Sequence, residues 1–126
     1  MKQLFIKKEN SPRLLLFFAG WGSDENLFRR TVAEGYDCLL CFDYRTLEFD
    51  YSLLDGYREI RLLAWSMGVW VAGQILSGHT YPWEMKLAVN GTPFPIDDRR
   101  GIAEALFHGT LENFSDAALA RFRRRI

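Results

Sequence analysis

Three short runs of consecutive apolar residues constrain the fold of this chain more than any other feature. They occupy residues 14–19, 38–42 and 62–65. None of them alternates with polar residues, as a strand with one solvated face would. Continuous runs of this length are typical of strands buried on both faces, as in a parallel sheet covered by helices. The length of 126 residues suits one domain built around one such core.

The elements predicted around these runs alternate strands with helices. Strands are expected over residues 3–8, 14–19, 38–42, 58–65 and 86–90. Helices are expected over residues 25–34, 67–76, 99–107 and 116–125, with a loop and one helical turn over residues 43–57. This order predicts an α/β fold with a mostly parallel sheet and flanking helices. We expect residues 1–96 to form its core and residues 97–126 to form a helical, lid-like segment.

Charge and cysteine content argue against several classes of protein. Lys+Arg and Asp+Glu both number 16, whereas a general nucleic-acid binder would be basic. No apolar run approaches the roughly 20 residues of a membrane span or suits a signal peptide, so a cytoplasmic protein is expected. Cys38 and Cys41 have the spacing of a redox or zinc pair. On a strand, however, they would point to opposite faces, which favours core packing and no metal site.

The sequence Ala64-Trp-Ser-Met-Gly68 joins a predicted strand to a predicted helix. It is close to the G-x-S-x-G nucleophile elbow, with Ala64 in place of the first glycine. Both flanking positions must be small because the tight turn brings them against neighbouring strands. The turn exposes the Ser66 hydroxyl, and the dipole of the following helix favours negative charge there. The alternative is that Ser66 merely caps that helix.

A second motif, Gly20-Trp-Gly22, follows the apolar run at residues 14–19. In hydrolases with the elbow, the loop after such a strand supplies one backbone N–H of the oxyanion hole, and the residue after the nucleophile supplies the other. These donors are assigned to Trp21 and Met67, with Gly20 and Gly22 letting the backbone turn. The alternative is a plain glycine turn. Both motifs end strands at the edge where open α/β sheets bind ligands, so Ser66 is interpreted as the nucleophile.

These motifs resemble the α/β-hydrolase superfamily. Further segments resemble the short pimeloyl-acyl-carrier-protein methyl ester esterases (BioG-like) of biotin biosynthesis, and they are residues 18–22, 64–70, 88–93, 95–97, 101–111 and 122–125. The resemblance covers nearly the whole chain. It implies a serine esterase that cleaves the methyl ester of pimeloyl-acyl carrier protein and releases methanol, with no cofactor.

The same resemblance suggests substrate and partner contacts. Trp65, Phe107 and Phe114 are expected to line the acyl-binding site together with Gly20 and Gly22, although core packing is the alternative for the aromatic residues. A basic cluster is expected to dock the acidic acyl carrier protein, and it consists of Arg121, Arg123, Arg124 and Arg125. The alternative for this cluster is a solvated helix end.

The usual catalytic histidine is missing from the expected place. In this fold the order is serine, acid, histidine. Asp97 is a candidate acid or a helix cap, and neither His79 nor His108 fits the position of the base. The chain is therefore expected to be the N-terminal part of a longer enzyme, with little activity alone and an open sheet edge able to pair with another copy. Alternatives are another small-ester hydrolase or thioesterase, or a non-catalytic acyl- or protein-binding module.

Overall fold

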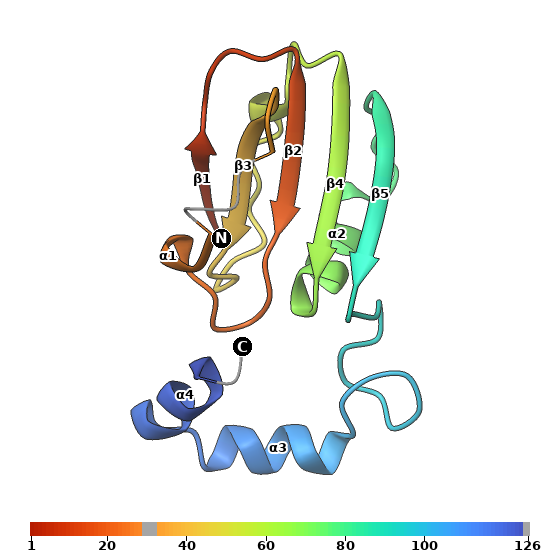
Figure 1. Ribbon diagram of the computed structural model, residues 1–126. Coiled ribbons are helices and arrows are strands. Elements are labelled where there is room, and N and C mark those ends of the chain that lie inside the picture. Colours follow the sequence, from red (N-terminus) through yellow and green to blue (C-terminus); the bar gives the residue numbers. More distant parts are fainter. Residues whose placement is uncertain (29–32, 125–126) are drawn as a thin grey trace.

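A twisted sheet forms the centre of the computed structural model, which describes residues 1–28 and 33–124 (Figure 1). Its strands lie in the order β1-β3-β2-β4-β5. Their bounds are β1 Lys2–Lys7, β2 Arg13–Phe18, β3 Asp37–Phe42, β4 Glu59–Trp65 and β5 Trp83–Val89. Strand β1 is antiparallel to β3, whereas β3, β2, β4 and β5 are parallel to their neighbours. The α/β fold is confirmed, with a mixed sheet that has one antiparallel strand at its edge.

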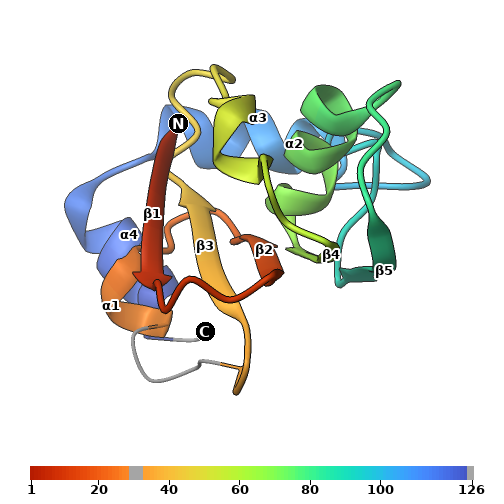
Figure 2. The ribbon, with the colours of Figure 1, turned by 90° about the horizontal axis from the view of Figure 1, so that it is seen from above.

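Helical elements cover both faces of the sheet and one of its ends. They are α1 Glu25–Phe28, the 3₁₀ turn η1 Tyr51–Leu54, α2 Met67–Leu76, α3 Glu104–Glu112 and α4 Asp116–Arg123. Seen from above, α2 and α1 lie on opposite sides of the sheet (Figure 2). Helices α3 and α4 cover neither face, because they lie beyond the carboxyl ends of the parallel strands (Figure 1). The region between those ends and α3–α4 is where the predicted site residues gather.

The apolar runs do form the core. Every residue of β3 is buried, which explains why its sequence does not alternate. Strands β2 and β4 are buried toward α2 and half-buried toward α1. Cys38 and Cys41 are both buried and free, as core packing predicts. Within residues 1–28 and 33–124, no helix combines the length and the apolar character needed to cross a membrane.

Two predicted boundaries near the sheet are wrong. Helix α1 is described over Glu25–Phe28, and residues 29–32 lie outside the described part of the chain. Glu34 lies in a turn, so the helix does not reach its predicted end. Strand β5 begins at Trp83, three residues before its predicted start. The sheet extends it, because the Ile60 amide of β4 donates to the Pro82 carbonyl at 2.9 Å.

The helix predicted over residues 99–107 is also misplaced. A tight loop occupies residues 97–102, closed by hydrogen bonds from the Gly101 amide to the Asp97 carbonyl and from the Asp97 amide to the Ile102 carbonyl, both 3.0 Å. Helix α3 therefore begins only at Glu104, whose amide donates to the Asp98 carboxylate at 3.0 Å. Asp98 thus caps this helix from six residues away. Helix α4 begins where predicted, and the Ser115 hydroxyl accepts from the Ala118 amide at 3.2 Å.

Candidate functional site

Ser66 stands at the junction of β4 and α2 in a strained backbone conformation. Its φ is 55° and its ψ is −124°. A positive φ is uncommon for a residue with a side chain, and such conformations persist only where the surroundings enforce them. Here the Ser66 amide donates to the Val89 carbonyl at 2.9 Å, so β5 holds the junction. The hydroxyl makes no capping hydrogen bond to α2, so the alternative that Ser66 caps this helix is wrong.

Close backbone approach explains the small residues on either side of Ser66. A Cβ on Gly68 would overlap the carbonyl oxygens of Phe18 and Ala19, so α2 starts almost in contact with the end of β2. Ala64 is buried between its strand partners Phe18 and Ala88. The predicted requirement for small residues two positions before and after the serine is therefore met by real contacts.

The glycine-tryptophan-glycine motif forms a β-turn, called here the 20–23 turn. The Ser23 amide donates to the Gly20 carbonyl at 3.3 Å, and Gly22 has a φ of +74°. A positive φ at the third position is the pattern of a type II turn, which favours glycine there. The hydrogen bond of the turn uses the Ser23 amide and leaves the Trp21 amide outside it. A Cβ on Gly20 would lie 3.2 Å from the Ser66 Cβ, so the turn and the serine are direct neighbours.

The second predicted donor belongs to the start of α2. Met67 is the first residue of that helix and follows Ser66 directly. Amides of the first helical turn have no partner inside the helix, and the positive end of the helix dipole lies there. The amide-bearing 20–23 turn and this helix start thus meet at Ser66, an arrangement suited to stabilising negative charge on a bound group.

Tyr44 supports the 20–23 turn at its base, and sequence reasoning missed it. Its hydroxyl lies 2.8 Å from the Ala19 carbonyl and 2.9 Å from the Cys41 carbonyl, and it shares its proton between them. Burial raises the pKa of Tyr44, so the hydroxyl remains a donor. The only sequence signal is a tyrosine two residues after a fully apolar strand, in a segment that was predicted as a loop.

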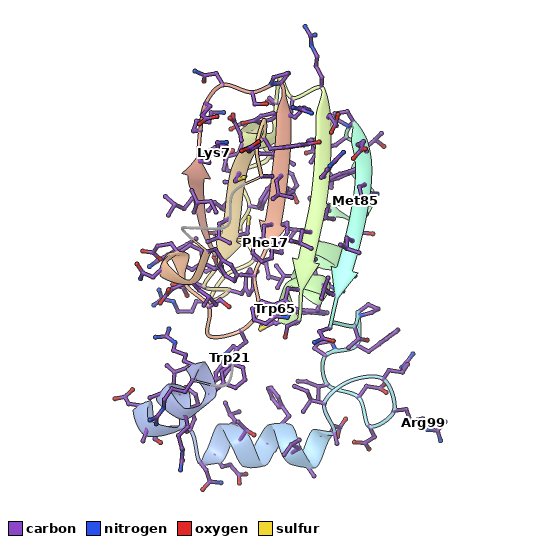
Figure 3. The ribbon with its side chains drawn as sticks, in the orientation of Figure 1. Lys7, Phe17, Trp21, Trp65, Met85 and Arg99 are labelled. Atoms are coloured by element: carbon purple, nitrogen blue, oxygen red, sulfur yellow. The ribbon has the colours of Figure 1, made fainter. Side chains whose placement is uncertain are left out.

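Helix α4 and the connection between α3 and α4 pack on the same turn. Figure 3 shows Trp65 at the end of β4 and Trp21 below it, between the sheet and α3–α4. The Trp21 ring packs edge-on against Phe122, with centroids 4.8 Å apart, and against Phe114 at 5.7 Å. Arg123 of α4 donates from Nε to the Gly22 carbonyl at 2.9 Å. Of the predicted acyl-site residues, Phe114 therefore touches the turn, whereas Phe107 is half-buried on α3.

An apolar hollow opens beside Trp65 on the α1 face of the sheet. Its volume is about 260 Å³, and its lining residues are Phe17, Leu27, Phe28, Leu63, Trp65 and Val89. The Trp65 ring packs edge-on against Phe28, with centroids 6.3 Å apart. A second apolar hollow of about 340 Å³ lies between α2 and β5 and is lined by Ala72, Gly73 and Leu87 among others. Trp65 is thus the predicted acyl-site residue that faces a hollow.

The Asp97 carboxylate makes its contacts within its own loop. One carboxylate oxygen accepts from the Arg99 and Arg100 amides at 3.0 and 2.8 Å, and the other pairs with the Arg100 guanidinium at 2.8 Å. Arg100 lowers the pKa of Asp97 to about 2. These contacts order residues 97–102 and cap no helix, because α3 begins only at Glu104, so the helix-cap alternative for Asp97 is wrong.

Neither histidine approaches Ser66 through the described contacts. His79 lies beyond the far end of α2 and stacks on Tyr51, with centroids 4.4 Å apart. A ten-residue helix spans about 15 Å, so His79 is at the opposite edge of the sheet. His108 is exposed on α3, where its ring packs edge-on against Phe107. Within the described ranges, no group of three or more His, Cys, Asp and Glu side chains is arranged to hold a metal ion.

The arginines of the basic cluster at the end of α4 differ in what they contact. Arg123 contacts the 20–23 turn and lies 3.8 Å from Asp24, so it is committed to an internal contact. Arg121 and Arg124 are exposed, and Arg124 donates only to the Ala120 carbonyl of its own helix. Arg125 lies outside the described residues. The predicted docking surface thus retains Arg121 and Arg124 as exposed cations.

Comparisons with known proteins cover the entire chain. A family model described as "Pimeloyl-ACP methyl esterase BioG" matches residues 1–126. A crystal structure of BioG from Haemophilus influenzae superposes with a TM-score of 0.89 at 44% identity, over 100% of this chain and 57% of that one. An uncharacterized protein of Haemophilus influenzae is 46% identical over 90% of this chain and 52% of its own length.

Another relative is named for a different activity. The malonyl-[acyl-carrier protein] O-methyltransferase of Bacteroides fragilis is 53% identical over 89% of this chain, but the match covers 23% of that protein. The chain thus spans about half or less of the length of the curated relatives it matches.

Proposed function

The chain belongs to the pimeloyl-ACP methyl esterase BioG family, and from that premise we propose that it carries the nucleophile of a serine esterase with an α/β-hydrolase fold. The substrate of this proposal is the methyl ester of pimeloyl-acyl carrier protein. The main support is the strained backbone of Ser66, whose hydroxyl makes no capping hydrogen bond to α2. This serine lies beside the 20–23 turn, whose own hydrogen bond does not use the Trp21 amide. Enforced strain of this kind is concentrated at functional sites.

The chemistry assigned to Ser66 is acyl transfer in two steps. The Ser66 oxygen bonds to the ester carbonyl carbon while its proton passes to a general base, and the Trp21 and Met67 amides stabilise the oxyanion. The bond to the methoxy oxygen then breaks, and the base returns the proton so that methanol leaves. Water next attacks the acyl-Ser66 ester, which releases the free carboxylate and restores the hydroxyl.

The general base and its acid are assigned outside these 126 residues. His79 is at the wrong end of α2, and Asp97 is occupied by its own loop. The matches cover 23% and 52% of the relatives' own lengths, which leaves room for both groups. In this proposal, residues 97–126 belong to a lid-like segment over the site, and its aromatic residues Phe107 and Phe114 face the substrate.

The acyl chain and the carrier protein are assigned separate surfaces. The hollow beside Trp65 is apolar and suits a short methylene chain. The exposed guanidinium groups of Arg121 and Arg124 suit an acidic carrier protein. Long-range attraction between these cations and the carrier protein would chiefly raise the rate at which the two proteins associate. Trp65 thus selects the acyl group, and the two arginines select its carrier.

A fluorophosphonate probe tests the nucleophile directly. The full-length protein is expected to be labelled at Ser66, to lose labelling in Ser66→Ala and to keep it in Ser77→Ala, a matched serine at the opposite end of α2. The wild-type protein should also release methanol from pimeloyl methyl ester on acyl carrier protein. Labelling at another residue, or equal labelling of both variants, would remove Ser66 from the proposed role.

A further inference from the structure

Arg123 makes a contact that neither helix packing nor solvation of α4 requires. Its Nε donates to the Gly22 carbonyl at 2.9 Å, across 101 residues of chain. Its Nη2 lies 3.8 Å from the Asp24 carboxylate, just beyond the turn. One guanidinium therefore joins two points on the 20–23 turn and its exit, whereas its neighbour Arg124 turns back to its own helix.

Apolar contacts beside this hydrogen bond fix the rest of the turn. Phe122 packs against the Trp21 ring. An ideal Cβ on Gly22 would lie 3.5 Å from atoms of Leu119 and Phe122, which is ordinary van der Waals contact. The ring of the second turn residue and the carbonyl of the third are thus both held by α4.

These two anchors matter because the turn has one backbone hydrogen bond of its own, the 3.3 Å bond from the Ser23 amide to the Gly20 carbonyl. Local opening of the turn would break this bond and change the direction of the Trp21 amide. Holding the Gly22 carbonyl and the Trp21 ring from outside opposes that change. The Trp21 amide, which the hydrogen bond of the turn leaves unused, then keeps one direction beside Ser66.

We propose that Arg123 is a positioning residue, which holds the 20–23 turn in the form that offers the Trp21 amide to the oxyanion formed at Ser66. This inference rests on the proposed function of Ser66. It also removes Arg123 from the surface that meets the carrier protein and gives it a role inside the enzyme. Displacement of α4 would release the turn, so the position of this helix sets the rate of acyl transfer.

The experiment compares Arg123→Gln and Arg123→Lys with Arg45→Gln in the full-length protein. Arg45 is the matched control because it also pairs with an aspartate, Asp43, but only two residues away. Hydrogen–deuterium exchange of the amides at residues 21–24 reports on the turn without requiring activity. Hydrolysis of p-nitrophenyl butyrate reports on acyl transfer without requiring the carrier protein.

In Arg123→Gln we expect exchange of these amides to accelerate about tenfold because local opening becomes easier. We expect kcat to fall about tenfold with little change in KM, since a displaced oxyanion donor acts on the transition state. Arg123→Lys keeps the charge beside Asp24 but lacks the Nε donor, so its kcat should lie between those of Arg123→Gln and the wild type. Arg45→Gln should match the wild type in both measurements.

Unchanged exchange in Arg123→Gln would overturn the inference, because the turn would then not depend on Arg123. Faster exchange with wild-type kcat would overturn it as well, since the contact would be an anchor with no effect on the reaction. A wild-type protein that hydrolyses no ester would overturn the proposed function instead. Exchange would still decide in that case whether Arg123 holds the turn.

Discussion

Gly20 lies against Ser66 so closely that a Cβ at position 20 would stand 3.2 Å from the Ser66 Cβ. The same atom would stand 3.1 Å from two carbons of the Trp65 ring. Both separations are tighter than ordinary van der Waals contact. The spacing between the 20–23 turn and the serine is therefore set by the absence of a side chain on one residue.

Replacing Gly20 with alanine tests the importance of this spacing. The φ of Gly20 is outside the left-handed region, so alanine brings crowding without backbone strain. We expect Gly20→Ala to lower kcat of the proposed ester hydrolysis about tenfold, because the added Cβ pushes the turn away from Ser66. The unfolding free energy should fall by only about 1 kcal/mol. Wild-type kcat on p-nitrophenyl butyrate, with urea denaturation confirming a folded variant, would contradict this prediction.

Two glycines of α2 should respond in opposite directions to the same substitution. A Cβ on Gly68 would overlap the carbonyl oxygens of Phe18 and Ala19, whereas one on Gly73 would meet nothing within 4 Å. Gly68→Ala is expected to lower the unfolding free energy by about 3 kcal/mol through overpacking. Gly73→Ala should raise it by about 0.5–1 kcal/mol, because alanine favours a helix interior. Urea midpoints of the two variants measure the difference, and shifts of the same sign would argue against the close approach of α2 to β2.

A buried carboxylate at the other end of the sheet predicts how stability depends on pH. Asp37 is fully buried, and it accepts hydrogen bonds from the Glu9 and Ser11 amides and from the Tyr57 hydroxyl. Lys8 lies 3.1 Å away. Burial alone would raise the pKa of Asp37, but these donors outweigh it and hold the pKa at about 2.

The sign of the effect follows from a folded-state pKa below the unfolded one. The contribution of Asp37 is complete above the unfolded value and is lost as pH falls through the folded value. The unfolding free energy should therefore drop by about 2 kcal/mol between roughly pH 5 and roughly pH 2 on account of this group. Asp37→Asn should be less stable at neutral pH and lack this part of the pH dependence, whereas the exposed Asp55→Asn should retain it. An unchanged acid profile in Asp37→Asn would refute the assignment.

Charge reversal at Arg121 and Arg124 tests the proposed carrier-protein surface. Arg121→Glu and Arg124→Glu remove exposed cations that have no described contact with the 20–23 turn. We expect kcat/KM for the carrier-bound methyl ester to fall about tenfold, with the loss shrinking at high salt as the charges are screened. Hydrolysis of free dimethyl pimelate should change far less. Equal losses on both substrates would indicate that these residues act on the site rather than on the carrier.

Local pattern was sufficient for the elements that position Ser66. The apolar run ending at Trp65, the serine and the helix Met67–Leu76 are adjacent in the chain, so sterics and periodicity predict their arrangement. The closeness of Gly20 to Ser66 was predictable for a similar reason, because adjacent parallel strands bring their carboxyl ends together.

The misplaced features depend on contacts that local sequence does not encode. The sequence around Asp97 suggests a catalytic acid or a helix cap, and it does not indicate that this carboxylate pairs with Arg100 inside a loop. The basic run on α4 gave no sign that Arg123 would reach Gly22, since 101 residues separate them. Tyr44 lies in a segment without periodicity. Its structural role depends on contacts with the Ala19 carbonyl, just beyond β2, and the Cys41 carbonyl of β3, which local sequence does not indicate.

The hydrogen bond from the Ser66 amide to the Val89 carbonyl makes the position of Ser66 depend on β5. Gly91, two residues further on, packs so tightly beneath the Ser66 carbonyl that any side chain there would collide with it. A displacement of β5 would therefore move the Ser66 backbone with it. Substitutions along β5 can therefore lower the rate of the proposed ester cleavage by moving Ser66, although they contact no reacting atom.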